Sequence, residues 1–196
     1  MNISNKIKTN LFKDQNSYQY IWLFATALSV LLIMYFSYIN IGYQLDDSLI
    51  YLRYIKNFIN GEGLVYNKGV YFNGLTSPFY SYVMVFLSYL TGEKNLQYLS
   101  IAVSALSLSA TSILGATLFY NKNNTWYFIS ILTVGTFPYF YTVYGMETNL
   151  FLLLIVTSLY LYKTNNIKLL GISCALLFLT RSEGIFGSGS NLDVID

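Results

Sequence analysis

The sequence contains no histidine and only one cysteine among its 196 residues. The single thiol, Cys174, cannot form a disulfide within the chain, and without histidine it cannot complete an ordinary zinc site. Serine and cysteine nucleophiles that depend on a histidine base are excluded as well. Any general base in this chain must therefore be a carboxylate, a lysine or a tyrosine.

Charge is also scarce. Charged residues make up 10% of the chain, against about 25% in ordinary globular domains. Hydrophobic residues account for 55%, and the mean hydropathy is +0.47. This composition predicts an integral membrane protein whose surroundings are the lipid bilayer. The net charge is only +2, and lysine and arginine are scattered, so we expect no nucleic-acid partner.

Apolar runs that approach the length of a membrane span recur along the chain. A spanning helix needs about 20 mostly apolar residues. The uncharged run from Tyr18 to Leu45 is too long for a signal-peptide core, so we interpret it as containing an uncleaved first span. We expect Pro138 to kink the third span and the fifth to extend to about Phe186. The five expected spans are residues 19–41, 98–120, 125–145, 148–162 and 169–180.

The stretch 77–91 is short for a span and begins with Pro78 after Ser77, a favourable start for a helix. Its path can be inferred from lysines, because cytoplasmic loops are enriched in Lys and Arg. If 77–91 dips into the membrane and returns, the N-terminus lies in the cytoplasm together with Lys122, Lys163 and Lys168. The acids and arginine at the span ends then gather on the outer face: Asp46, Asp47, Glu147, Arg181 and Glu183.

Residues 48–60 are expected to form an amphipathic helix along the membrane surface. Apolar residues recur at helical spacing of three and four, and Gly61 follows as a C-terminal cap. The apolar stripe consists of Leu49, Leu52, Ile55, Phe58 and Ile59. The opposite side is expected to carry Arg53, Lys56 and Asn57.

Carboxylates at the span ends are the candidates for chemistry. Asp46 and Asp47 either cap the following helix or provide a general base, whose pKa would rise through partial desolvation at the membrane interface. Glu147 is either a solvated loop end or a functional acid. Arg181 is either an interfacial anchor or a guanidinium that grips phosphate, for which its geometry is suited.

Four strings occur in order between residues 20 and 184: DDSLIYLRYIKNFINGEGLVYN, NGLTSPFYSY, YGMETNLF and LTRSEG. Together they resemble bacterial multi-pass glycosyltransferases of the GT-C type, similar to arabinofuranosyl-, aminoarabinose- and mannosyltransferase-like proteins. The resemblance implies an all-α integral membrane fold, with 48–60 and 77–91 as two juxtamembrane helices of the first outer loop. It also implies sugar transfer from a polyprenyl-phosphate carrier to a glycan, lipid or protein acceptor, at the outer face of the bacterial cytoplasmic (inner) membrane.

The same resemblance implies roles for individual residues. Asp46, with Asp47 beside it, would be the base that deprotonates the acceptor hydroxyl, and the sugar would transfer with inversion. Glu147 would orient the acceptor, or hold a divalent metal in members that use one, although the sequence itself indicates no metal. Arg181 and Arg53 would face the lipid-linked phosphate. A further substrate-binding candidate is Glu183, in the LTRSEG string.

The sequence departs from the family in two respects. Ser182 stands where proline is common, and the chain is shorter than such enzymes. We therefore expect residues 1–186 to be the N-terminal module of a longer enzyme and 187–196 to be a flexible polar tail. The alternative is a non-catalytic multi-pass membrane protein: a transporter fragment, an assembly subunit or an inactive truncated product. A transporter would carry charges deep inside its spans, whereas the charges here lie at span ends.

Overall fold

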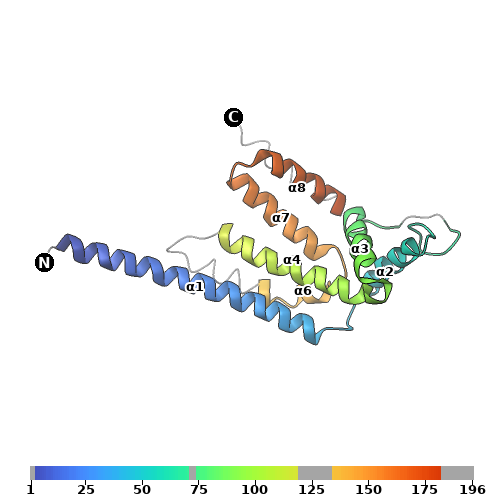
Figure 1. The fold of residues 1–196 in the computed structure, drawn as a ribbon, viewed down its shortest axis with the longest axis horizontal. Coiled ribbons are helices and arrows are strands. Elements are labelled where there is room, and N and C mark those ends of the chain that lie inside the picture. The colour runs from blue at the N-terminus through green and yellow to red at the C-terminus, as the bar shows by residue number, and fades with distance from the viewer. Residues whose placement is uncertain (1–2, 71–73, 119–133, 182–196) are drawn as a thin grey trace.

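A computed structural model describes residues 3–70, 74–118 and 134–181 of the chain. All regular secondary structure in these residues is helical (Figure 1). The expected all-α fold is therefore confirmed for this part of the chain. Helices pack side by side in the order α1, α4, α7 and α8, while α2 and α3 lie at one end of this bundle. The bounds are α1 (Ile3–Ile39), α2 (Asp46–Ile59), α3 (Pro78–Thr91), α4 (Leu96–Leu118), α7 (Thr148–Lys163) and α8 (Ile167–Thr180).

Within the described residues, two stretches are long and apolar enough to cross a membrane: Trp22–Ile39 within α1, and Glu93–Leu118, which contains α4. Helices α7 and α8 are apolar as expected, but with 16 and 14 residues they are shorter than the roughly 20 that a span needs. The expected extension of the last helix to Phe186 is wrong. Helix α8 ends at Thr180 because the backbone of Arg181 is already extended, with φ −153° and ψ 137°.

The expected span 125–145 falls partly outside the described residues, and its described part is not one helix. Residues 134–136 are helical, the helix breaks at Phe137 and Pro138, and it resumes only as the short α6 (Tyr139–Thr142). We expected a kink at Pro138, and the structure has a full break there. The reason is that proline lacks the N–H that would continue the helix. The chain then turns at Gly145 before α7 begins.

Small polar side chains line the contacts between the long helices. Ser112 Oγ of α4 donates to Ser29 Oγ of α1 at 2.9 Å, and Ser158 Oγ of α7 lies 2.9 Å from Ser173 Oγ of α8. Large apolar side chains point outward instead: Leu31 is 63% exposed and Leu106 is 70% exposed. Close packing through small residues, with apolar residues outside, is typical of helices surrounded by lipid.

The C-terminal end of α1 and the N-terminal end of α4 lie at the same end of the bundle. Gln44 Nε2, just after α1, donates to Ser100 Oγ in the first turns of α4 at 2.7 Å. Helix α3 therefore does not carry the chain to the opposite end. At that opposite end, Lys163 Nζ donates to the carbonyl oxygen of Leu118, so α4 and α7 run in the same direction. On which side of a membrane each end lies stays a prediction.

Helix α2 is present where 48–60 was expected to be helical, but its inward face is only partly the expected stripe. Ile55 is fully buried, whereas Leu49 is 50% exposed. Asn57, expected on the outer side, is buried because its amide donates to the carbonyl oxygens of Val65 and Tyr66. Ser48, Tyr51 and Tyr54 complete the buried side. The inward face of α2 is therefore rich in hydrogen-bonding groups.

Candidate functional site

The site is built around the turn that precedes α7. Gly145 in this turn has φ +87°, a conformation that favours glycine, and a Cβ there would lie 2.8 Å from Ser48 Cβ. Its carbonyl oxygen accepts a hydrogen bond from Tyr80 Oη at 2.8 Å, and its N–H donates to Ser104 Oγ at 3.3 Å. Residues of α2, α3 and α4 thus hold this turn in place. The turn sets the position of Glu147, two residues further along the chain.

Glu147 is the buried charge of this site, since only 3% of the residue is exposed. Its Oε1 lies 3.8 Å from Arg181 Nε, while its Oε2 has no hydrogen-bond partner among the described residues. The Arg181 side chain stays 39% exposed, and its Cζ lies 5.9 Å from the ring centroid of Phe151. Burying a carboxylate is costly unless it is paired, so the arginine compensates the charge. The other carboxylate oxygen can still accept a hydrogen bond.

Tyr51 on α2 completes the surroundings of the carboxylate. Its ring stands edge-on to Tyr80, with centroids 5.4 Å apart, and its hydroxyl lies 2.8 Å from Thr76 Oγ1. Burial raises the pKa of Tyr51 to about 12, and the neighbouring Glu147 charge also raises this pKa. Near neutral pH, Tyr51 is therefore a neutral hydroxyl that positions hydrogen bonds, and it cannot serve as a base.

Further buried oxygen atoms belong to the segments that meet at this turn. Gln44 Oε1, Ser77 Oγ and Asn149 Oδ1 have no hydrogen-bond partner in the described part of the chain. Gln44 Nε2 would lie 2.9 Å from a Cβ at residue 145, so this side chain directly borders the turn. Amide oxygens can only accept hydrogen bonds. Gln44 and Asn149 therefore each leave a buried acceptor at this end of the bundle.

Asp46 and Asp47 lie in the exposed first turn of α2. The N-cap residue is Leu45, and no side chain forms a cap hydrogen bond, so neither aspartate has the capping role considered from the sequence. Ser48, the next residue, packs on the Gly145 turn. Asp47 and Tyr51 are four residues apart and so share one side of the helix. The acidic pair thus lies at the start of the helix whose Ser48 packs on the Gly145 turn.

The remaining candidate residues do not join Glu147 in the described structure. Arg53 is exposed and binds the following loop: its Nε donates to the Tyr66 carbonyl oxygen at 2.9 Å, and its Nη2 donates to Asn67 Oδ1 at 2.9 Å. Its guanidinium carbon lies 4.2 Å from the Tyr66 ring centroid. Glu183 lies outside the described residues. No three His, Cys, Asp or Glu side chains within those residues group as metal ligands.

Sequence reasoning missed the residues that hold Glu147. Tyr51 and Tyr80 are two of 20 tyrosines, and nothing in their spacing distinguishes them from tyrosines at a membrane interface. The strings were a signal for all of them: Tyr51 lies in DDSLIYLRYIKNFINGEGLVYN, Thr76 and Tyr80 lie in NGLTSPFYSY, and Gly145 lies in YGMETNLF. The structure brings the last two of these strings together with the start of α2 and the end of α8.

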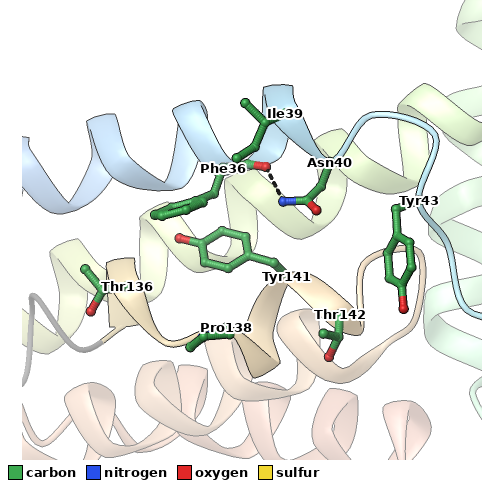
Figure 2. Close-up of a pocket in the computed structure, with 8 residues that line it drawn as sticks. All are labelled: Phe36, Ile39, Asn40, Tyr43, Thr136, Pro138, Tyr141 and Thr142. Atoms are coloured by element: carbon green, nitrogen blue, oxygen red, sulfur yellow. Dashed lines mark hydrogen bonds between the residues drawn. The ribbon is translucent and has the colours of Figure 1, made fainter.

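In the described part of the chain, two of the cavities near this end of the bundle are lined by neither Glu147 nor Arg181. Figure 2 shows the first, about 270 Å³, where the Tyr141 ring lies beside Phe36, and Asn40 Nδ2 donates to the Phe36 carbonyl oxygen at 2.8 Å. Its lining is mostly apolar: Phe36, Ile39, Asn40, Tyr43, Thr136, Pro138, Tyr141 and Thr142. The second, about 330 Å³, lies between α2 and the following loop and is lined by Ile50, Tyr54, Tyr66, Asn67, Val70 and Gly74.

Comparison with known protein families, with curated proteins and with solved structures gives no match for this chain. A function must therefore be argued from the residues at this end of the bundle and from the strings that contribute them.

Proposed function

We propose that the chain is a membrane glycosyltransferase of the GT-C type, or the N-terminal module of one. It transfers a sugar from a polyprenyl-phosphate carrier to an acceptor at the outer face of the bacterial cytoplasmic membrane. One observation carries most of the support: the buried Glu147 carboxylate faces Arg181 at the end of an apolar bundle, where the helix that begins with Asp46 and Asp47 packs. The proposal assigns acid, base and cation to this one end of the bundle.

The arrangement suits transfer with inversion at the anomeric carbon. Asp46, assisted by Asp47, takes the proton of the acceptor hydroxyl, whose oxygen forms a bond to the anomeric carbon. The bond between that carbon and the phosphate oxygen breaks, and the polyprenyl phosphate leaves with the electron pair. Arg181, 39% exposed, stabilises the charge on this phosphate, while Glu147 accepts a hydrogen bond from the acceptor and orients it.

Placement in the membrane follows from the outward apolar side chains and from the lysines. The outer surfaces of α1 and α4 are apolar, and α2 exposes Leu49 and Ile50 beside its charged start. This combination fits a helix that lies in the interface between lipid and water. The cytoplasmic N-terminus and the outer position of the site rest on the distribution of lysines.

The second candidate function is a non-catalytic membrane protein, either a transport component or an assembly subunit. A transport pathway requires ionisable groups within the membrane, and these face the interior of the bundle. The stretches Trp22–Ile39 and Leu96–Leu118 contain no charged residue. The charges at the bundle end favour chemistry at the interface instead.

The test measures sugar transfer in membranes from cells that express the full chain. Radiolabelled polyprenyl-phosphate-linked mannose, glucose, galactose and arabinose serve as donors, and label in endogenous acceptors is the readout. We expect Asp46→Asn to lower transfer at least about 100-fold, which is the contribution typical of a general base. The control is Glu93→Gln, which removes an acid that pairs with Lys56 at 2.9 Å.

Two results would overturn the proposal. Transfer that survives in the Asp46→Asn, Asp47→Asn double variant would show that neither aspartate is the base. Absence of transfer from every donor with the unmodified chain would reject the proposed activity and favour the non-catalytic alternative.

A further inference from the structure

Glu147 and Arg181 form a charged pair in which one member is buried and the other reaches the surface. The Glu147 side chain is 4% exposed, whereas the Arg181 side chain is 39% exposed. Arg181 Nε lies 3.8 Å from Glu147 Oε1, a distance longer than a hydrogen bond, so the attraction of opposite charges joins these two atoms. A second anion that approaches from outside therefore meets the arginine before it meets the carboxylate.

The two members of the pair are anchored very differently. Glu147 follows the turn at Gly145, whose carbonyl oxygen and N–H are both hydrogen-bonded to side chains of α3 and α4. Arg181 lies beyond the last helical residue of α8, and its backbone is extended, with φ −153° and ψ 137°. Of the two side chains, the arginine is therefore the one that can change its partner while the other stays in place.

The surroundings of the pair favour an anion. Burial raises the pKa of Tyr51 to about 12, and the charges of Glu147 and Arg181 act on this pKa in opposite directions, so both charges lie near the Tyr51 hydroxyl. That hydroxyl is 2.8 Å from Oγ1 of the exposed Thr76, and α3 begins two residues later, in contact with α8 (Figure 1). Ser77 Oγ, at this helix start, is fully buried and has no hydrogen-bond partner among the described residues. The N-terminal end of a helix carries partial positive charge, which attracts anions.

We infer that Arg181 pairs with Glu147 only while the donor is absent, and that the phosphate of the donor takes the arginine from Glu147 when it binds. This inference rests on the proposed function, because it concerns the regulation of the same site. The planar guanidinium bonds phosphate in two places. Release of Glu147 Oε1 adds a second acceptor beside Oε2, which has no partner in the described structure. The acceptor hydroxyl groups therefore bind more tightly once the donor is in place, and by linkage the acceptor strengthens donor binding equally.

Glu147 also distinguishes the donor from the lipid phosphate that leaves. A lipid-linked sugar phosphate is a diester with about one negative charge, whereas the leaving phosphate is a monoester with about 1.5–2 negative charges near neutral pH. The Glu147 carboxylate competes for Arg181 and repels both, and the repulsion is larger for the monoester. Return of Arg181 to Glu147 therefore favours release of the product.

The experiment measures binding of methyl phosphate, a monoester, and dimethyl phosphate, a diester, to the full chain in dodecyl maltoside micelles, which contain no phosphorus. Line broadening in phosphorus NMR gives the Kd, and far-UV circular dichroism checks that each variant keeps its helices. We expect Glu147→Gln to bind methyl phosphate about tenfold more tightly, as loss of a nearby, partly screened charge does, with a smaller gain for dimethyl phosphate. Arg181→Gln abolishes binding in both the original and the Glu147→Gln background. The control is Glu93→Gln, which removes an acid that pairs with Lys56 at 2.9 Å and leaves both Kd values unchanged.

The outcomes separate this inference from the proposed function. An equal Kd for methyl phosphate in Glu147→Gln and in the unmodified chain overturns the exchange of Arg181, as does binding that persists in Arg181→Gln or is absent from both chains. None of these results bears on the transfer assay, so sugar transfer can stand without the exchange. The expected phosphate binding without transfer from any donor rejects the glycosyltransferase and retains the exchange of Arg181 between Glu147 and a phosphate.

Discussion

Substitution of Gly145 by alanine tests the central contact of the fold, where the turn before α7 meets α2. Two independent costs arise at this position. The backbone φ of +87° is unfavourable for any residue with a Cβ, at a cost of about 1–2 kcal/mol. The new methyl group would also lie 2.8 Å from Ser48 Cβ and 2.9 Å from Gln44 Nε2, and overpacking of this kind costs about 1–3 kcal/mol.

Gly61 provides a control that isolates the second cost. Its φ is +80°, close to that of Gly145, yet a Cβ there would meet nothing within 4 Å. We therefore expect Gly61→Ala to lower the free energy of unfolding by about 1 kcal/mol, and Gly145→Ala to lower it by about 2–5 kcal/mol. The difference between the two variants measures how tightly α2 packs on the turn.

The assay is reversible unfolding in mixed micelles of a mild detergent and sodium dodecyl sulfate, followed by far-UV circular dichroism. A second alanine control, at Gly115, adds a methyl group within α4 that also meets nothing within 4 Å, at an ordinary φ. Equal losses for Gly145→Ala and Gly61→Ala would refute the reasoning, because they would show that α2 does not approach the turn. The proposed grouping of the acidic pair with Glu147 would then fail as well.

Three further predictions follow from the same end of the bundle. The raised pKa of Tyr51, about 12, means that the folded chain holds this proton more tightly than the unfolded chain, so its stabilising contribution is complete below pH 10 and is lost between pH 10 and 12. Urea unfolding at several pH values should show a smaller loss across this window in Tyr51→Phe. In a Cys174→Ser background, cysteines at the exposed Thr142 and Thr164 should react with an impermeant maleimide from opposite sides of the membrane; reaction from one side would refute the assigned path of α7. Glu147→Gln should change the free energy of unfolding by no more than about 1 kcal/mol while sugar transfer falls.

Most of the helices could be predicted from the sequence because long apolar runs and charge-poor composition are strong signals. The boundaries of α2, α4 and α7 fall within two residues of those expected. The break at Pro138 was predicted only as a kink, since a sequence does not reveal whether neighbouring helices hold the two halves in line. Helix α8 ends early at Arg181, whose backbone is extended and whose side chain approaches Glu147.

The candidate site was predicted less completely, and α2 shows why. Apolar spacing correctly placed Ile55 inside, but it also placed Leu49 inside, where the structure has it 50% exposed. On a helix face that contacts lipid, an apolar residue gains as much from facing outward as from facing inward. Hydrophobic periodicity alone therefore cannot assign the inner face of such a helix. Tyr51 and Ser48 occupy that face because the Tyr51 hydroxyl lies 2.8 Å from Thr76 Oγ1 and Ser48 packs on Gly145, contacts that only the folded arrangement creates.

The expected effect of Glu147→Gln follows from how this carboxylate is placed. Glu147 is the N-cap residue of α7, yet its side chain forms no cap hydrogen bond, so it does not stabilise the helix in the usual way. Removing one partner of a fully buried ion pair costs about 3–5 kcal/mol, because the other charge is stranded. Arg181 is 39% exposed, so water can solvate it, and the amide relieves the burial of a carboxylate that is only 4% exposed. These two effects oppose the lost attraction, which is why we expect little net change in stability. A loss of 3 kcal/mol or more in the unfolding assay would instead identify the pair as structural, and Glu147 would have to be withdrawn from the proposed reaction.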